Sequence, residues 1–106
     1  MPPATSVILP YRDAASTIEI AIRSVLQGEP ADEVELLAID DGSRDDGPAR
    51  VAALGDPRVR RLDGGGRGLV AALELGRAEA RGAWIARMDA DDVSLPGRLA
   101  AQRAAL

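Results

Sequence analysis

Three carboxylates stand close together where a short apolar run ends. Asp89, Asp91 and Asp92 follow the run from Ala83 to Met88. Clustered carboxylate oxygens are hard ligands of the kind that Mg²⁺ and Mn²⁺ take in proteins. An EF-hand is excluded, because the positions that need Gly and Glu hold Ser and Ala. A second interpretation stays open, in which these aspartates only solvate a loop and cap the next helix.

Two further polar stretches have the residue types for ligand binding. The stretch Asp40-Asp41-Gly42-Ser43 ends another apolar run. An aspartate at a strand end can accept a hydrogen bond from a base or a ribose hydroxyl, although Asp-Gly is also a common turn. The stretch DGGGRG, residues 63–68, could cradle a phosphate at a helix N-terminus or serve as a flexible connection. It matches neither the dinucleotide fingerprint nor the P-loop.

The composition excludes several classes of protein. With 106 residues and 46% apolar residues, the chain fits one small globular domain, residues 1–106. It has no Cys and no His, and all 13 basic residues are Arg, which excludes thiolate metal sites, histidine triads and lysine Schiff bases. The net charge of −4 and the scattered arginines argue against nucleic acid as a partner. Neither a signal peptide nor a membrane-spanning run is visible, which predicts a cytoplasmic location.

The apolar pattern predicts alternating strands and helices. Four short apolar runs read as strands, at residues 6–10, 34–39, 59–62 and 83–88. Segments with helical periodicity separate and follow them, at residues 18–28, 46–53, 69–80 and from about residue 96 onward. Ser16 and Glu19 form the S-x-x-E pattern of a capping box at the first helix.

This alternation predicts how the polar stretches are brought together. Strands that alternate with helices form a parallel sheet with right-handed crossovers. We therefore expect an α/β fold with a four-stranded, mostly parallel sheet in the order 3-2-1-4 and helices on both faces. Ligands of such sheets bind outside the carboxyl ends of the strands. The loops after residues 10, 39 and 88 should accordingly meet at one edge.

Taken in order, the motifs resemble those of one enzyme family. They are S-V-I-L-P in the first strand, S-V-L-Q in the first helix, A-I-D-D-G-S after the second strand, R-G-L-V-A-A-L in the third helix and M-D-A-D-D-V-S-L-P-G-R-L after the fourth strand. This set resembles the family 2 glycosyltransferases, inverting nucleotide-sugar enzymes with a Rossmann-like GT-A fold. The resemblance covers about residues 5 to 106, and the last motif is its most specific part.

The resemblance implies a role for each matching position. The loop Pro10, Tyr11, Arg12 and Asp13 would line the base pocket, and Asp41 would face the base with Asp40 beside it. Asp89-Ala90-Asp91 would be the D-x-D motif, in which Asp91 binds Mn²⁺ or Mg²⁺ and Asp89 lies towards the ribose, the diphosphate and the metal. Arg67 would reach the diphosphate. The donor would be a UDP-, GDP- or dTDP-sugar.

The sequence also departs from the family pattern. Tyr11-Arg12-Asp13 stands where V-Y-N is common, and Gly66 and Glu74 stand where Asn is frequent. Family members continue into a second half with the acceptor site and an acidic general base, whereas this chain ends soon after the D-x-D helix. We therefore expect the donor-binding half, with no identifiable acceptor base, self-association through exposed apolar surface, and a location at the inner membrane surface for a longer protein.

Three alternatives come from other classes. A receiver-type phosphoacceptor domain also clusters aspartates around Mg²⁺, but it uses a lysine, and this chain has none. A non-catalytic module that binds a nucleotide or nucleotide-sugar would keep the pocket without the transfer. A NAD-binding domain is disfavoured because no glycine fingerprint follows the first strand.

Overall fold

The fold is a single parallel sheet with helices on both of its faces. The computed structural model describes residues 2–105, so Met1 and Leu106 of the predicted domain lie outside it. The strands follow the order β3-β2-β1-β4, and every neighbouring pair is parallel, as predicted. They are β1 (Thr5–Tyr11), β2 (Val34–Asp40), β3 (Val59–Asp63) and β4 (Trp84–Arg87), and the helices are α1 (Ile18–Gly28), α2 (Gly47–Ala53), α3 (Leu69–Glu79) and α4 (Arg98–Ala105).

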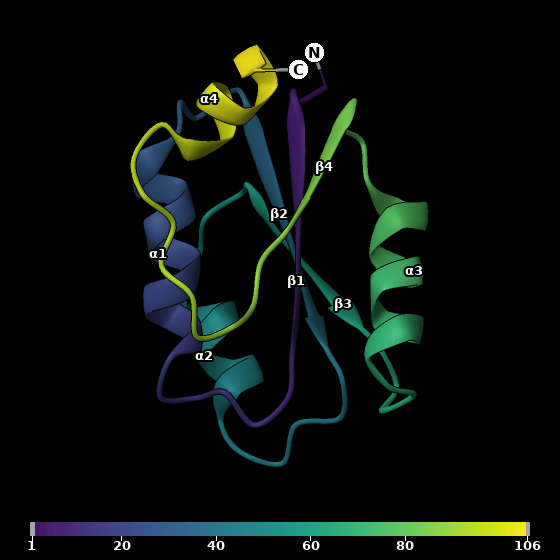
Figure 1. Cartoon of the computed structure of the whole chain (residues 1–106). Coiled ribbons are helices and arrows are strands. Elements are labelled where there is room, and N and C mark those ends of the chain that lie inside the picture. The colour runs from purple at the N-terminus through teal and green to yellow at the C-terminus, as the bar shows by residue number, and fades with distance from the viewer. Residues whose placement is uncertain (1, 106) are drawn as a thin grey trace.

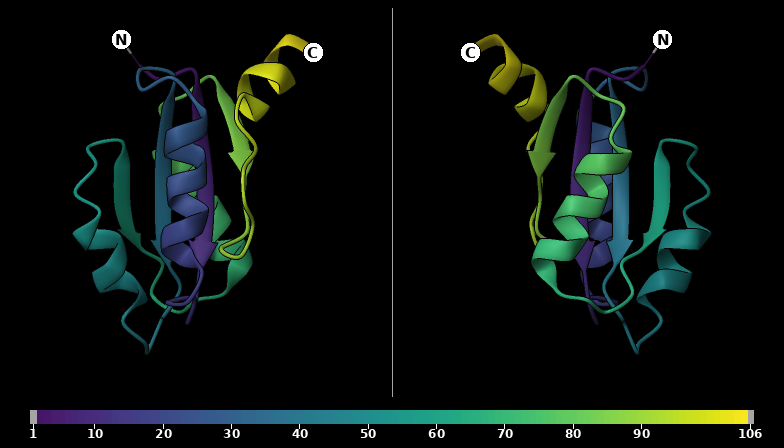
Figure 2. Two further views of the ribbon diagram at one scale, coloured as in Figure 1. Left: turned by 90° about the vertical axis from the view of Figure 1, so that its left-hand side faces the viewer. Right: turned by 90° about the vertical axis from the view of Figure 1, so that its right-hand side faces the viewer.

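The two central strands carry the core because both of their faces are covered. Every residue of β1 is buried, as is β2 up to Ile39. Helices α1 and α2 lie on one side of the sheet and α3 on the other (Figure 1). Figure 2 shows the two faces in turn, with α1 in front in one view and α3 in the other. The larger apolar cluster lies on the α1 side and the smaller one, with Ile8, Leu37, Ile39 and Ala72, on the α3 side.

Helix α3 approaches the sheet closely at one glycine. A Cβ atom on Gly76 would lie 2.6 Å from the side chain of Ile8 and 2.9 Å from that of Ile39. Only a residue without a side chain lets the helix pack at this depth. None of the helices within residues 2–105 has the length and apolar content that a membrane crossing requires.

The predicted capping box at the start of α1 is wrong. The helix begins at Ile18 after Thr17, whose side chain makes no capping hydrogen bond. The carbonyl of Ala14 instead accepts the amides of Thr17 and Ile18, at 3.0 and 2.8 Å. Glu19 is therefore not needed at the helix start, and it pairs with Arg23 one turn later at 3.0 Å.

A buried carboxylate links the strands near the end of the sheet at which they begin. Glu35 on β2 is 5% exposed and accepts hydrogen bonds from the Ser6 hydroxyl at 2.6 Å, the Arg81 amide at 2.7 Å and the Arg60 guanidinium at 3.2 Å. The Ser6 hydroxyl in turn accepts the Gly82 amide at 2.8 Å. Burial alone would raise the pKa of Glu35, but these hydrogen bonds outweigh it and hold the pKa below its ordinary value of 4.5.

The edge strand β4 is the least covered part of the sheet. Within residues 2–105 it pairs with β1 alone, and Trp84 and Ile85 are 40% and 49% exposed. Val93 and Leu95, in the segment that follows, are exposed as well. An unpaired strand edge next to exposed apolar side chains favours association with another chain.

Candidate functional site

The carboxyl ends of β1, β2 and β3 meet at one edge, where their loops are fastened to one another. In Figure 1 these loops gather at the end of the sheet opposite the two termini, and the segment after β4 runs down toward them. The Tyr11 carbonyl accepts the Asp41 amide at 2.8 Å, and the Asp40 carbonyl accepts the Gly64 amide at 2.7 Å. The parallel order of the strands thus brings the predicted polar stretches of β1, β2 and β3 together.

The loops after β1 and β2 are held together by Asp13. Its carboxylate accepts the Arg44 amide, at 2.6 Å, and its own amide donates to the Ser43 hydroxyl at 3.1 Å. The backbone of Asp13 has φ +50°, a conformation that Asp tolerates better than most residues. The hydrogen bond from the Arg44 amide lowers the pKa of Asp13, so the carboxylate stays ionised. Asp13 therefore positions the loops, a role that the sequence did not indicate.

The two aspartates after β2 have different surroundings. Asp40 accepts the Ser43 amide at 2.8 Å through one carboxylate oxygen and faces a pocket. Asp41 accepts the Gly68 amide at 3.1 Å and so fixes the entry into α3. Each carboxylate uses one oxygen in these hydrogen bonds, which leaves its second oxygen for a ligand.

The glycine-rich loop lies directly against the loop after β2. A Cβ atom on Gly42 would lie 3.0 Å from the Cα atom of Gly66, and both residues have positive φ, +83° and +67°. The Gly65 amide donates to the Asp63 carboxylate at 2.8 Å. These hydrogen bonds and contacts fix the loop at this edge of the sheet, with Arg67 exposed beside it.

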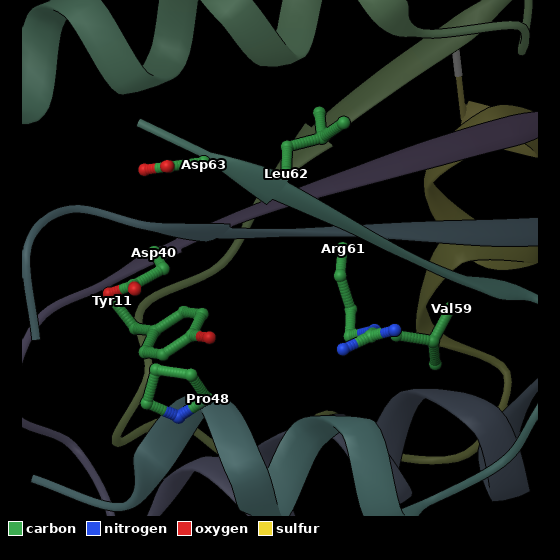
Figure 3. A pocket seen from close by; sticks show the side chains of 7 residues that line it. All are labelled: Tyr11, Asp40, Pro48, Val59, Arg61, Leu62 and Asp63. Atoms are coloured by element: carbon green, nitrogen blue, oxygen red, sulfur yellow. The ribbon is translucent and has the colours of Figure 1, made fainter. Parts of the chain in front are cut away.

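A pocket of about 570 Å³ opens between β3 and α2 at this edge. Its lining residues are Tyr11, Asp40, Pro48, Val59, Arg61, Leu62 and Asp63 (Figure 3). Of the residues predicted to contact the base, Tyr11 and Asp40 line this pocket, whereas Asp41 does not. Pro10 is buried within β1, while Arg12 and Asp13 are exposed and do not line it. Burial, with the nearby Asp40 and Asp45 carboxylates, raises the pKa of Tyr11 to about 12, so its phenol remains a neutral donor.

The acidic residues after β4 form a compact cluster. Oxygens of Asp89, Asp91 and Asp92 all lie within 4.8 Å of one another, and all three side chains are exposed. The Asp92 amide donates to the Asp89 carbonyl at 3.1 Å, which curls the segment into a turn. Arg87 lies 3.5 Å from Asp89. Three carboxylate oxygens this close together are a donor set that could hold Mg²⁺ or Mn²⁺, and Asp92 lies in the same cluster as the two predicted ligands.

The segment that carries this cluster is docked on the end of α1. The Ser94 amide donates to the Ser24 hydroxyl and the Gly97 amide to the Gly28 carbonyl, both at 2.8 Å. The buried carboxylate of Glu29 accepts the Ala100 amide in the first turn of α4 at 3.1 Å. These contacts join residues about 70 positions apart, so the local sequence did not reveal them.

Comparison with known families decides the identity. Residues 6–106 match the profile described as Glycosyl transferase family 2. The chain belongs to this family. It is 46% identical over 101 residues to the succinoglycan biosynthesis protein ExoO of Rhizobium meliloti, a match that covers 93% of this chain and 28% of that protein. It is 38% identical over 102 residues to ExoU of the same organism, covering 92% of this chain and 29% of that protein.

Solved structures of glycosyltransferases share the fold. The crystal structure of Staphylococcus aureus TarS 1–349 superposes with a TM-score of 0.82 at 23% identity, covering 98% of this chain and 32% of that one. The mannosyltransferase PcManGT from Pyrobaculum calidifontis, in complex with GDP-Man and Mn²⁺, gives a TM-score of 0.82 at 26% identity, covering 99% and 32%. The family 2 chain described here thus spans about three tenths of the length of these relatives.

Proposed function

We propose that this family 2 chain binds the nucleotide-diphosphate-sugar donor of an inverting, metal-assisted glycosyl transfer. One observation carries the proposal. The loops after β1, β2 and β3 meet at a single edge of the sheet and are hydrogen-bonded to one another, and an acidic cluster follows β4. The mannosyltransferase with the same fold binds GDP-Man and Mn²⁺, which supports a ligand of this class. Calorimetric titration of nucleoside diphosphates with and without Mn²⁺ tests the role.

Each group of residues has its part in this proposal. Asp40 and Tyr11 lie at the pocket that receives the base, while Asp13 and Asp41 hold the surrounding loops in place. Arg67, beside the glycine-rich loop, approaches the diphosphate, where a guanidinium matches phosphate oxygens.

The acidic cluster would hold the divalent cation. Asp91, with Asp89 and the neighbouring Asp92, would supply its protein ligands. A cation bound there supplies Lewis-acid stabilisation of the diphosphate as it leaves. Without it, three neighbouring carboxylates repel one another and repel an anionic donor. Arg87, 3.5 Å from Asp89, offsets part of this charge.

The second candidate function is that of a non-catalytic module, which binds the nucleotide-sugar without transferring the sugar. We assign no acceptor base within residues 2–105, so we expect the chain alone to release no nucleoside diphosphate when a saccharide acceptor is added to UDP-, GDP- or dTDP-sugars. A coupled assay for the released nucleotide measures this. Acceptor-dependent release that Asp91→Ala abolishes would contradict the expectation and place the whole reaction in this chain. A longer parent protein that transfers the sugar would be the enzyme, whereas one that only binds the nucleotide-sugar would be the module.

We also expect the chain to self-associate through the edge of β4. A second copy that pairs along this strand would cover Trp84 and Ile85 and satisfy the free backbone groups of the edge. Light scattering should show a mass that rises with concentration, and Ile85→Lys should reduce the association because charged side chains at an edge block pairing. A uniform monomer at high concentration for the unmodified chain would refute this prediction.

A further inference from the structure

The segment between β4 and α4 carries the acidic cluster but forms no helix or strand of its own. It comprises residues 88–97. In Figure 1 it descends from β4 to the edge of the sheet at which the loops gather, turns, and returns beside α1 to reach α4. The side chains of Asp89, Asp91 and Asp92 are exposed. The arrangement of the three carboxylates therefore depends on how the two ends of this segment are held.

The first end of the segment is held by the sheet. The Met88 amide donates to the Ile8 carbonyl of β1 at 3.0 Å, at the point where the pairing of β4 with β1 ends. The Met88 side chain is buried. Asp89 thus directly follows a fixed residue, whereas Asp91 and Asp92 lie farther along and depend on the other end of the segment.

The second end is held by the hydroxyl of Ser24 on α1. This hydroxyl accepts the Ser94 amide at 2.8 Å and donates to the Ala21 carbonyl of its own helix at 2.7 Å. Because the donated hydrogen bond fixes the orientation of the hydroxyl, its acceptor side is aimed at the segment. Ser94 is buried and follows Asp92 by two residues. Within residues 2–105, the bond to Ser24 is the first one after the cluster that ties the segment to another element.

Two more hydrogen bonds hold the chain farther from the cluster. The Gly97 amide donates to the Gly28 carbonyl at 2.8 Å, and the Ala100 amide donates to the buried Glu29 carboxylate at 3.1 Å. Both involve the last residues of α1 and the start of α4. Neither depends on Ser24, so a change at Ser24 loosens the stretch next to the cluster and leaves α4 attached.

We propose that Ser24 is a positioning residue for the divalent cation: its hydroxyl holds the Ser94 amide and so keeps the three carboxylates of the acidic cluster together. This inference rests on the proposed function, because it takes the cluster as the metal site. Groups that orient metal ligands without touching the ion commonly change metal affinity by about tenfold. The S-V-L-Q stretch of α1 supplies no residue to the pocket or to the cluster, and Ser24 gives it a part in the site.

The test compares Ser24→Ala with Ser24→Thr, which keeps a hydroxyl. UDP, GDP and dTDP are titrated calorimetrically at a series of Mn²⁺ concentrations, which gives the concentration of Mn²⁺ that produces half of its full effect. Ser24→Ala should raise this concentration about tenfold and leave the nucleotide affinity without the ion unchanged. Ser24→Thr should stay close to the unmodified chain. Ser16→Ala, which removes an exposed hydroxyl just before the same helix, is the matched control and should change neither quantity.

Hydrogen exchange gives a second measurement that needs no ligand. The Ser94 amide should exchange at least about tenfold faster in Ser24→Ala. The Leu36 amide, which donates to the Arg58 carbonyl at 2.9 Å, should keep its rate. Alanine is a better helix former than serine, so we expect Ser24→Ala to fold. An unchanged rate at Ser94, or an equal acceleration at Leu36, would overturn the inference, because the hydroxyl would then not hold this segment specifically.

The possible results separate this inference from the proposed function. An unmodified chain whose nucleotide affinity does not respond to Mn²⁺ would overturn the metal site of the proposed function. A response in the unmodified chain, with the same Mn²⁺ requirement in Ser24→Ala, would overturn this inference alone. A loss of affinity in Ser24→Ala that is equally large without the ion would overturn it as well, because Ser24 would then support the nucleotide pocket rather than the cation.

Discussion

Replacing Asp91 with alanine is expected to remove the metal dependence of nucleoside diphosphate binding. The unmodified chain should bind the preferred nucleotide about tenfold more tightly with Mn²⁺ than without it, which corresponds to about 1.4 kcal/mol. Because Asp91 is one of three carboxylates whose oxygens lie within 4.8 Å of one another, its loss leaves too few charged ligands to hold the ion. Titrations of both proteins with and without Mn²⁺ measure the effect.

Two controls sharpen this experiment. Asp32→Ala removes an exposed aspartate near the opposite end of the sheet and should preserve the metal dependence. Asp41→Ala should weaken the nucleotide equally with and without metal, because Asp41 holds the Gly68 amide rather than the ion. Metal dependence that persists in Asp91→Ala would reject the assignment of the acidic cluster.

Replacing Glu35 with alanine is expected to lower the free energy of unfolding by about 3 kcal/mol. The change leaves the buried Ser6 hydroxyl and the partly buried Arg81 amide without their acceptor, and it removes one of the two carboxylates that pair with Arg60. Glu79→Ala is the matched control: Glu79 also contacts Arg60 but its side chain is 47% exposed, so the cost should be about 1 kcal/mol or less. Urea denaturation measures both. A loss in Glu35→Ala no larger than that in Glu79→Ala would show that the buried network contributes little.

The lowered pKa of Glu35 also leads us to expect that the stability of the chain depends on pH. The pKa of Glu35 in the folded chain lies below its ordinary value of 4.5, so the folded state binds this proton less readily than the unfolded state. The contribution is therefore complete above that ordinary value and is lost as the pH falls through the folded pKa. The difference in unfolding free energy between the unmodified chain and Glu35→Gln should shrink between about pH 6 and about pH 3.

The order of the strands and the edge that carries the candidate site were predictable from the sequence. Apolar runs of strand length, such as that ending at Asp40, alternate with helical periodicity, and parallel strands send their following loops to one edge. The acidic cluster at Asp89 and Asp91 was found in the same way, because charged residues directly after an apolar run are conspicuous. These features depend on local patterns, which the linear sequence contains.

Features that depend on distant contacts were not predictable. The hydrogen bonds of Asp13 join it to residues 30 and 31 positions away, which no local pattern indicates, and its expected contact with the base stays a prediction. The capping box failed because the Ala14 carbonyl already satisfies the first amides of α1. The sequence V-R-R-L does contain the alternation that separates Arg60 from Arg61, yet only the packing of α2 shows which arginine enters a pocket. Glu35 stands within an apolar run, a position at which a carboxylate indicates a buried hydrogen-bond network.

The measurement that tests the account most directly is the titration of UDP, GDP and dTDP into the unmodified chain, each with and without Mn²⁺. We expect saturable binding of at least one of them, with one nucleotide per chain and about tenfold higher affinity when the ion is present. Binding of none of the three, or binding with the same affinity with and without the ion, would contradict the assignment of this edge of the sheet as a metal-assisted site for a nucleotide-sugar donor.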